Sequence, residues 1–417
     1  MQGRHDMDFG YDTKTQALQE RMLDFMDQHV YPAEQVFAEQ ASEQAADPAT
    51  RWNSPPIVAA LKTQAREAGL WNLFAPPSIA GGAGLTNLQY APLAEISGRS
   101  PFLAPEAINC SAPDTGNMEV LAHFGTPEQQ KLWLNPLLAG EIRSGFCMTE
   151  PDVASSDATN IRTQITRDGE HLVINGRKWW TTGAMNPHCA VFIVMGKTDP
   201  DADTAHQQSM VLVPRGTSGM TIKRGLTLMG YDDSSHGGHA EIEFVDCRVP
   251  VTNMIGKAGD GFHIAQSRLG GGRIHHCMRL IGMAERAYDL MVQRAVSRSA
   301  FGKPLADQGV VHGWISQSRV RIEMARLLVL RAAWAIDERG GKGAHQEIQQ
   351  IKIAVPQMAE WVIDKAIQTH GAAGLSQDFI LAELWSQARA LRIIDGPDEV
   401  HEMSLAKKEI RRIRSAT

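Results

Sequence analysis

The sequence predicts an α+β protein with helices at both ends and a β-domain between them. In the first third, Leu18, Met22 and Phe25 recur at the spacing that places them on one face of a helix. Between 146 and 249 the hydrophobic period changes from helical to two, which is typical of strands. From 256 onward, long helical patterns return.

These changes of period divide the chain into three parts. We expect an N-terminal α-helical domain over 1–143, a middle β-domain over 144–255 and a C-terminal α-helical bundle over 256–417. With 417 residues, 43% of them hydrophobic, the chain is long enough to bury a large core. The net charge of -6 comes from interspersed acidic and basic residues, so nucleic acid is not an expected partner.

Composition also indicates the compartment. The five cysteines are scattered, with no C-x-x-C pair, and we interpret them as reduced thiols of a cytoplasmic, bacterial-type protein. Residues 1–11 lack the features of a signal or transit peptide, and 414–417 is not a peroxisomal tripeptide. A mitochondrial or peroxisomal address in a longer precursor stays open. No apolar run approaches the length of a membrane span, so membrane insertion is not expected.

The N-terminal part is expected to hold helices over about 13–40 and 57–68. The Pro/Gly loop at 74–86 has neither G-x-G-x-x-G spacing nor a preceding strand, so a dinucleotide-binding loop is not expected there. Thr126 and Pro127 mark a helix start, the first as N-cap and the second at the first helical position.

The middle part carries strand signals. Asn175 and Gly176 predict a hairpin, because Asn-Gly takes the positive φ angles that a type I′ turn needs. Apolar runs at 190–195 and 210–213 predict buried strands. At 240–244 apolar residues alternate with two glutamates, which predicts a half-exposed strand.

Two long helices are expected over 310–339 and 344–370, with Pro356 kinking the second. The helix that begins near 261 is expected to be interrupted by the three glycines at 270–272. Four histidines nearby in sequence lack metal-ligand spacing, so no metal site is expected; they are His236, His239, His275 and His276.

The stretch 146–156 is interpreted as one wall of a flavin site. A strand would place Phe146 and Met148 on one face and Cys147 and Thr149 on the other. The hydroxyl and backbone N–H of Thr149 would then reach the edge of a flavin ring. The Ser-rich turn that follows would suit a pyrophosphate or a polar ligand tail. An ordinary strand followed by a turn is the alternative.

Three motifs carry a resemblance to one family. Phe-Cys-Met-Thr-Glu-Pro at 146–151 resembles the first signature of acyl-CoA dehydrogenases. Arg-Ser-Ala-Phe-Gly-Lys-Pro at 298–304 matches that family's Arg-x-x-Phe-Gly-Lys-Pro in full. Gln-Thr-His-Gly-Ala-Ala-Gly at 368–374 resembles its Gln-x-x-Gly-Gly-x-Gly, with Ala372 in place of the second glycine. The resemblance extends over about 13–412 and is strongest to the subgroup of family members ten and eleven.

The resemblance implies a fold and an activity. It implies an N-terminal α-helical domain, a middle β-domain and a C-terminal four-helix bundle, with FAD between the last two, in a homotetramer or homodimer. The implied reaction is the α,β-dehydrogenation of an acyl-CoA thioester to a trans-2-enoyl-CoA, as in fatty acid β-oxidation. Flavin N5 would accept the β-hydride, and an electron-transfer flavoprotein would take up the electrons.

The resemblance also assigns residues to the cofactor. Trp180 would shield the flavin ring, Thr182 would approach its reactive edge, and Arg298 would clamp a diphosphate. The loop at 368–374 would contact the adenosine half from a neighbouring subunit. A core tryptophan, a solvent-facing charge and a helix-capping glycine are the structural alternatives. The residues expected at FAD are Phe146, Met148, Thr149, Ser155, Trp180, Thr182, Arg298, Phe301, Gln368, Gly371, Gly374 and Glu399. Those expected at the substrate are Ser155, Leu269 and Arg273.

Asp395 is expected to remove the α-proton. It lies among Ile393, Ile394 and Gly396, and partial desolvation there would raise the pKa of its carboxyl and make it a stronger base. The family usually has glutamate at this position, so the shorter aspartate needs a compensating shift, since a misplacement of about 1 Å can cost roughly a hundredfold in rate.

Other acidic residues and another position compete with Asp395. Some branches of the family carry the base on the helix near Arg273, where this chain has Gly272 and no side chain. Asp398, Glu399 and Glu402 are interpreted instead as acids of a helix N-terminus. Two other function classes stay open: a nitroalkane-oxidase-like or other flavin oxidase or monooxygenase, and a non-catalytic acyl-CoA-binding protein.

Overall fold

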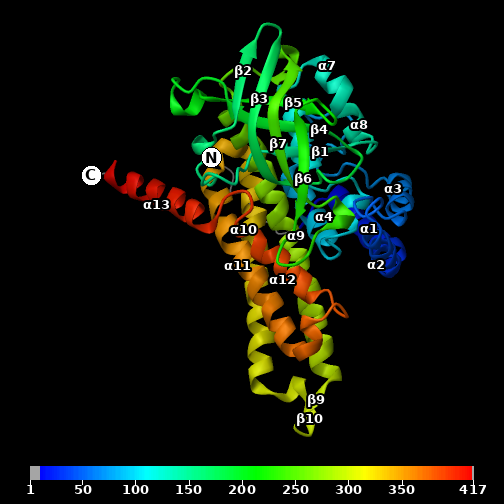
Figure 1. Cartoon of the computed structure of the whole chain (residues 1–417). Coiled ribbons are helices and arrows are strands. Elements are labelled where there is room, and N and C mark those ends of the chain that lie inside the picture. Colours follow the sequence, from blue (N-terminus) through cyan, green and yellow to red (C-terminus); the bar gives the residue numbers. More distant parts are fainter. Residues whose placement is uncertain (1–9, 416–417) are drawn as a thin grey trace.

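The computed structural model describes residues 10–415, apart from the side chains of Leu269 and Gly270. The expected absence of a leader within 1–11 falls mostly outside these residues. In chain order, short helices come first, an eight-stranded sheet follows, and long helices complete the chain (Figure 1). This confirms the predicted α+β class.

The N-terminal helices agree with the sequence periodicity. The helix expected over 13–40 continues to Ala46 and includes a π-helical segment, Met26–Val30. Thr126 caps α7 as predicted: its Oγ1 accepts a hydrogen bond from Gln129 N at 3.2 Å, and Gln129 Oε1 accepts one from Thr126 N at 3.1 Å. The helices are α1 (Thr13–Phe25), α2 (Tyr31–Ala46), α3 (Ile57–Glu67), α4 (Asn87–Gly98), α5 (Ala104–Ala107), α6 (Asp114–Phe124), α7 (Pro127–Gln129) and α8 (Asn135–Leu138).

The middle domain is a mixed sheet whose main path runs β6-β7-β3-β2-β4-β5-β8, with β1 pairing in parallel with β4. The apolar runs predicted as strands at 190–195 and 210–213 lie in β4 and β5. The strands are β1 (Arg143–Cys147), β2 (Gln164–Asp168), β3 (His171–Thr182), β4 (Cys189–Lys197), β5 (Gln208–Pro214), β6 (Met220–Leu226), β7 (His239–Pro250) and β8 (Met254–Ile255).

The hairpin predicted at Asn175 and Gly176 is wrong. Both residues lie inside β3, and the turn is made at 169–170, where Asp168 pairs with His171. Gly176 marks an irregularity in the pairing of β3 with β7, and a Cβ there would lie 2.3 Å from Thr163 Oγ1. The glycine therefore permits a close approach within the sheet.

The strand predicted to be half-exposed at 240–244 is more deeply covered than expected. Glu241 is only 8% exposed. Its carboxylate binds Arg224 Nε at 2.8 Å and lies 3.5 Å from Arg177 Nη1. Alternation of glutamate with apolar residues did not reveal these partners, because they lie on neighbouring strands.

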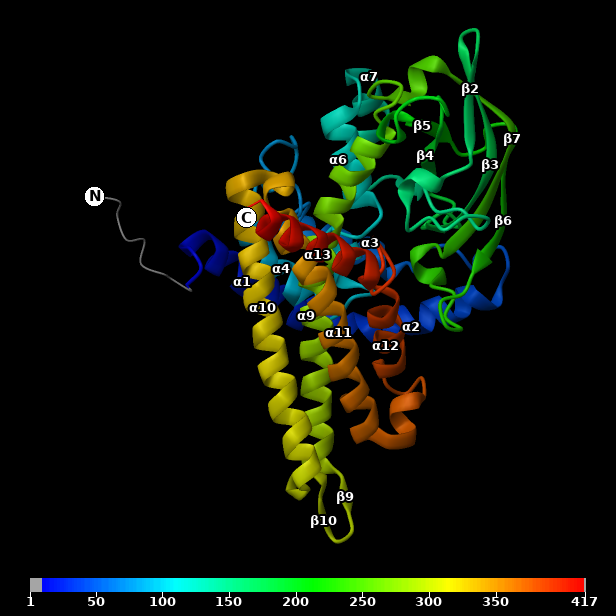
Figure 2. The same cartoon turned by 90° about the vertical axis from the view of Figure 1, so that its left-hand side faces the viewer.

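The C-terminal part is the helical bundle. Helices α9, α10 and α11 pack side by side, and α12 packs on α11 (Figure 2). A small hairpin, β9 with β10, lies at the end of the bundle far from the sheet. Helix α13 extends away from the body of the protein (Figure 1). The elements are α9 (Gly261–Ser297), β9 (Ser299–Ala300), β10 (Lys303–Pro304), α10 (Gly309–Gly343), α11 (His345–His370), α12 (Leu381–Ala390) and α13 (Asp398–Arg414).

The interruption predicted at 270–272 is wrong, because α9 runs unbroken through the three glycines. Helix α11 also continues through Pro356, and the kink expected there stays a prediction. A glycine costs a helix about 1 kcal/mol relative to alanine, which is small beside the burial of a 37-residue helix packed on three sides. Tertiary packing therefore overrides the local signal.

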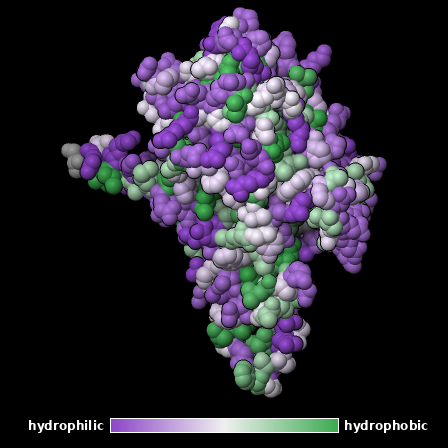
Figure 3. All heavy atoms as spheres, viewed as in Figure 1, coloured by the Kyte–Doolittle hydropathy of each residue, from purple (hydrophilic) through white to green (hydrophobic). Residues whose placement is uncertain are grey.

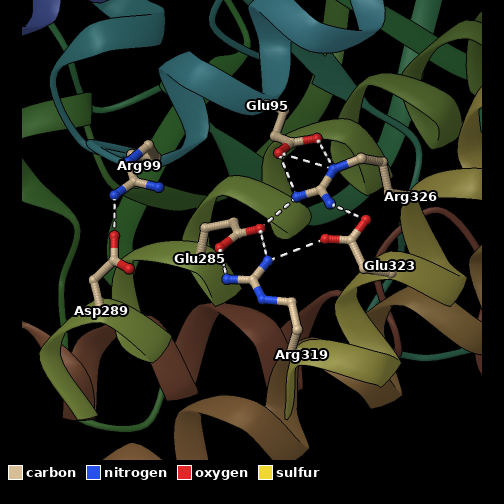
Figure 4. A network of polar contacts seen from close by, with 7 residues as sticks. All are labelled: Glu95, Arg99, Glu285, Asp289, Arg319, Glu323 and Arg326. Atoms are coloured by element: carbon tan, nitrogen blue, oxygen red, sulfur yellow. Dashed lines mark hydrogen bonds and ion pairs between the residues drawn. The ribbon is translucent and has the colours of Figure 1, made fainter. Parts of the chain in front are cut away.

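An ion-pair network joins the N-terminal helices to the bundle (Figure 4). Arg326 of α10 binds Glu95 of α4 at 2.8 Å, Glu323 at 2.6 Å, and Glu285 of α9. Arg319 binds Glu285 at 2.7 Å. Three helices from two domains thus share one set of charges.

Packing within residues 10–415 forms two large cores and one small cluster at the α10–α11 junction. The N-terminal helices share one core with the bundle, whereas the inside of the sheet forms a second. Among residues 10–415, no helix has the length and apolar character needed to span a membrane.

Apolar side chains gather on the surface over the lower half of the bundle (Figure 3). The exposed apolar side chains of the bundle include Val296, Phe301, Val310, Val320, Met324 and Leu375.

Candidate active site

The two segments predicted to face a flavin lie side by side. Trp179 N donates a hydrogen bond to Thr149 O at 3.0 Å. Lys178 Nζ donates to Met148 O at 2.9 Å and binds Glu150 Oε1 at 2.8 Å, and its side chain is fully buried. The end of β3 therefore holds the residues that follow β1 in a fixed position.

The alternation predicted at 146–149 is confirmed for its first three residues. Cys147 is buried in the sheet core, whereas Phe146 and Met148 pack against the helical core. The guanidinium of Arg268, from α9, lies 3.9 Å from the centre of the Phe146 ring. Phe146 thus faces the bundle, on the side where the resemblance expects the cofactor.

Trp180 is held in an unusual conformation. Its φ is 54°, and 37% of the residue is exposed. Its ring lies 5.5 Å from that of His239, which also contacts Thr182 Oγ1 through Nδ1 at 3.1 Å. A left-handed backbone at a bulky residue is costly and recurs at ligand sites. A partly exposed indole near hydroxyl side chains fits a flat aromatic ring such as that of FAD.

Asp395 lies in the loop between α12 and α13 with φ 58°, and its side chain is 13% exposed. Arg273 Nε donates a hydrogen bond to Asp395 O at 2.9 Å. His276 Nε2 lies 3.6 Å from Asp395 Oδ2. A Cβ on Gly272 would stand 3.2 Å from the same oxygen. The side chain of Asp395 therefore occupies the space beside the helical position from which other branches of the family present their base.

The prediction that the pKa of Asp395 is raised is wrong. Burial by itself raises the pKa of this carboxyl, but four basic neighbours lower it by more, so it falls below its ordinary value of 3.8. The neighbours are His276, Arg268, Lys352 and Arg273; near neutral pH the two arginines and the lysine carry the charge, because burial keeps the pKa of His276 at about 3. The carboxylate is therefore ionised at neutral pH and ready to accept a proton.

The sequence did not single out Arg268 or Glu119. Arg268 Nε donates to Asn117 Oδ1 at 3.0 Å, and the residue is 9% exposed. A Cβ on Gly271 would lie 2.6 Å from Glu119 Oε2. Burial, opposed by the charge of Arg268, raises the pKa of Glu119 to about 7. Arg268 stands four residues before Gly272, so a continuous helix would have placed both on one face.

The three residues predicted at the substrate have different surroundings. Arg273 contacts the Asp395 loop, as given above, whereas the side chain of Leu269 lies outside the described residues. Ser155 Oγ accepts a hydrogen bond from Glu150 N at 2.9 Å and closes the turn after Thr149. Its hydroxyl therefore already has a role within the chain.

The structure does not bring the other predicted cofactor residues to this site. Arg298 and Phe301 lie at the β9–β10 hairpin, where Phe301 is 99% exposed. Gln368 lies in the last turn of α11, and Gly371 and Gly374 follow that turn, at the same far end of the bundle (Figure 2). In one chain these five residues are therefore separated from the flavin wall by the length of the bundle.

The acidic competitors of Asp395 have other surroundings. Asp398 Oδ2 accepts hydrogen bonds from Arg392 Nε at 2.8 Å and Gln357 Nε2 at 3.0 Å. Glu399 and Glu402 are exposed on α13. Within residues 10–415, no group of three or more His, Cys, Asp or Glu side chains has the arrangement of a metal site.

A basic cavity lies between α13 and the junction of α10 with α11. Its volume is about 740 Å³. Burial, together with the charges of Lys408 and Arg273, lowers the pKa of His345 in its wall. The cavity is therefore electropositive and lies within the electrostatic reach of Arg273. Its basic lining residues are Lys342, His345, Lys407, Lys408, Arg411 and Arg412.

Comparison with known proteins identifies the family of the chain. Its residues 12–141, 145–247 and 259–410 match the N-terminal, middle and C-terminal domains of acyl-CoA dehydrogenases. It is 55% identical to the probable acyl-CoA dehydrogenase FadE2 of Mycobacterium tuberculosis, over 98% of each chain. It is 50% identical to human acyl-CoA dehydrogenase family member 11, covering 95% of this chain but 50% of that protein.

A solved structure gives the same result. The putative acyl-CoA dehydrogenase from Mycobacterium abscessus superposes with a TM-score of 0.94 at 49% identity, over 97% of this chain and 100% of the other. The chain spans about half the length of its human relative. The predicted enzyme class and the predicted cofactor, FAD, are confirmed, and the chain belongs to the acyl-CoA dehydrogenase family.

Proposed function

We propose that the protein dehydrogenates an acyl-CoA thioester to a trans-2-enoyl-CoA, with Asp395 removing the α-proton. One observation carries this proposal: a buried, ionised carboxylate faces the helix α9 that also contacts the flavin wall. Arg268 links the two sides, since it lies 3.9 Å from the Phe146 ring centre and lowers the pKa of Asp395. A base on one side of the thioester and a flat ring on the other would suit removal of a proton and a hydride from adjacent carbons.

Each side of the site has its own task in this reaction. Bound FAD supplies the acceptor for the β-hydride. Thr149, Trp180 and Thr182 line the ring, and Asp395 holds the α-proton once it has been removed. Arg273 fixes the carbonyl of Asp395, which orients the loop that bears the base.

The basic cavity between α13 and the α10–α11 junction would hold the phosphates of CoA. Lysine and arginine side chains there present several cationic donors with few acids among them, a composition suited to phosphate groups. Arg273, which contacts the Asp395 loop, lowers the pKa of His345 in the wall of this cavity, and this supports assigning the cavity to the substrate.

The residues at the far end of the bundle suit a second subunit. Arg298, Phe301, Gln368, Gly371 and Gly374 would contact the FAD of a neighbouring copy in a homodimer or homotetramer. The exposed apolar surface of the bundle supports such an assembly (Figure 3). Glu399, exposed on the first turn of α13, would face the adenine side of the cofactor in the same assembly.

Three further assignments complete the proposal. The domain boundaries fall at 143/144 and 255/256, near the start of β1 and the end of β8. An electron-transfer flavoprotein accepts the electrons. The protein acts in the cytoplasm, in keeping with five unpaired, buried cysteines.

An anaerobic titration tests the function. The purified flavoprotein is mixed with saturated acyl-CoAs of several chain lengths while the visible spectrum is recorded. We expect one length class to bleach the flavin band, and Asp395→Asn to abolish the bleaching. Glu402→Gln, an exposed acid on α13, is the matched control and should bleach as the unmodified protein does.

Other outcomes separate the alternatives. A flavin that responds to no acyl-CoA but is rapidly reoxidised by oxygen after chemical reduction would support the oxidase branch. A protein that copurifies without flavin and is indifferent to Asp395→Asn would support a binding protein.

A further inference from the structure

Lys352 of α11 is a buried cation that contacts the loop bearing Asp395. Its exposed fraction is 1%. Its Nζ donates hydrogen bonds to Leu391 O and Ile394 O, each at 2.7 Å. Within residues 10–415, no carboxylate lies at ion-pair distance from this ammonium group. A lysine buried without such a partner is rare, because its desolvation is costly.

The two carbonyls belong to the turn that immediately precedes Asp395. Leu391 is the C-cap of α12 and the first residue of the turn, and Ile394 is the neighbour of Asp395. Hydrogen bonds from an ammonium group are roughly twice as strong as those between neutral groups. Lys352 thus holds both ends of this four-residue segment from the side of α11.

The conformation of Asp395 needs such support. Its φ of 58° lies in the left-handed region, which costs a non-glycine residue about 1 kcal/mol or more. Arg273 holds the carbonyl of Asp395 from α9, while Lys352 holds the preceding carbonyls from α11. Two helices therefore fix the backbone on both sides of the residue, and the carboxylate is directed to Gly272.

We propose that Lys352 is a positioning residue that fixes the loop of the base. This rests on the proposed function, in which Asp395 removes the α-proton. Aspartate is one methylene shorter than the glutamate usual at this position, so its backbone must bring it to the substrate. The charge of Lys352 also lowers the pKa of Asp395, and the geometry and the electrostatics agree.

The test isolates the proton transfer from the redox step. The probe is an acyl-CoA in which sulfur replaces the β-carbon, so that no hydride can leave. Exchange of its α-protons with D₂O is followed by mass spectrometry, as a function of pH, on the FAD-loaded protein. Lys352→Met keeps the length and the apolar stem of the side chain but removes the ammonium group.

We expect Lys352→Met to bind the probe normally and to exchange α-protons about ten- to a hundredfold more slowly. The midpoint of the acid limb of the exchange rate should also move to higher pH, which a purely structural role would not cause. Lys365→Met is the control: Lys365 lies on the same helix and pairs with Asp364, away from the loop. It should exchange as the unmodified protein does.

A second variant, Lys352→Ala, tests the same proposal if Lys352→Met does not fold. Lys352→Ala leaves space for a small alkylammonium ion, and added propylammonium should raise the exchange rate while propanol should not. No rise with propylammonium would overturn the positioning role. So would wild-type exchange and an unchanged pH profile in Lys352→Met. If the unmodified protein neither exchanges α-protons nor loses its flavin band with any acyl-CoA, the proposed function itself fails.

Discussion

Nε2 of His276 lies 3.6 Å from Oδ2 of Asp395, across the gap between α9 and the loop before α13. His276 follows Gly272 by four residues, and Gly272 follows Arg268 by four, so all three share one face of α9. Burial, with the charge of Arg279, lowers the pKa of His276 to about 3, so this imidazole is neutral near pH 7. The face of α9 opposite Asp395 therefore presents the permanent charge of Arg268, the missing side chain at Gly272 and the neutral imidazole of His276.

In the proposed reaction, the lowered pKa of Asp395 sets the pH dependence. Because its basic neighbours hold the pKa of this carboxyl below 3.8, it stays ionised throughout the weakly acidic range. We expect kcat/KM to stay flat from pH 7 down to about pH 5, since its acid limb reports the base of the free enzyme. Stopped-flow reduction of the flavin over that range checks this. A midpoint near pH 6 would mean that desolvation prevails over the charges.

Substitution of Gly272 tests the space beside the base. A Cβ there would lie 3.2 Å from Asp395 Oδ2, so Gly272→Ala must displace the carboxylate by a few tenths of an ångström. We expect flavin reduction by acyl-CoA to slow about tenfold, with little change in stability.

Positions 395 and 272 also predict that the carboxylate proposed as the base can be moved from one to the other. Gly272→Glu combined with Asp395→Gly should reduce its flavin faster than Asp395→Gly alone, because both positions open into the same space. Gly271→Glu with Asp395→Gly is the control, since position 271 faces Glu119 instead. Equal rates in the two double variants would contradict the shared position.

Glu119 makes stability depend on pH. Burial raises the pKa of its carboxyl from 4.5 to about 7, so the folded protein binds the proton more tightly than the unfolded chain does. The stability linked to Glu119 is complete below pH 4.5 and is lost as pH rises through about 7. At pH 8 the cost approaches about 3 kcal/mol.

Glu119→Gln removes this charge while keeping the shape. We expect the variant to be more stable than the unmodified protein at pH 8 and about equal at pH 5, by thermal unfolding at both pH values. Glu128→Gln, an exposed acid just beyond the same helix, should show no such difference. A constant offset between pH 5 and pH 8 would contradict the raised pKa.

Arg326 should be the most sensitive member of the network in Figure 4. It is 19% exposed and binds Glu95, Glu285 and Glu323 from three helices. Arg326→Met would leave Glu95 without a cation and Glu285 and Glu323 with Arg319 alone, at a cost of about 3 kcal/mol. Denaturant unfolding should detect it. Arg412→Met, which removes a 68% exposed arginine paired with Glu409, should change stability by less than about 1 kcal/mol.

Some errors of the sequence interpretation share one physical cause. Asn175 and Gly176 have the composition of a turn, yet the sheet places them inside β3, because Gly176 is needed where Thr163 approaches. The glycines at 270–272 have low helix propensity, yet packing on α4, α10 and α11 keeps α9 continuous. Because a break was predicted there, the four-residue spacing that places Arg268, Gly272 and His276 on one face of α9 was not used in the prediction.

The sequence by itself determined the α+β class, the order of the three parts and the family signatures, and its resemblance to the family led to the prediction that Asp395 is the base. These depend on local periodicity, capping and short motifs, which the order of residues carries directly. Only the tertiary structure decided the direction of the pKa shift of Asp395, the contacts of Lys352 with its loop, and the distance of Arg298 and Gln368 from the flavin wall. Charges and hydrogen bonds act through space between separate helices, and no local pattern of residues encodes those distances.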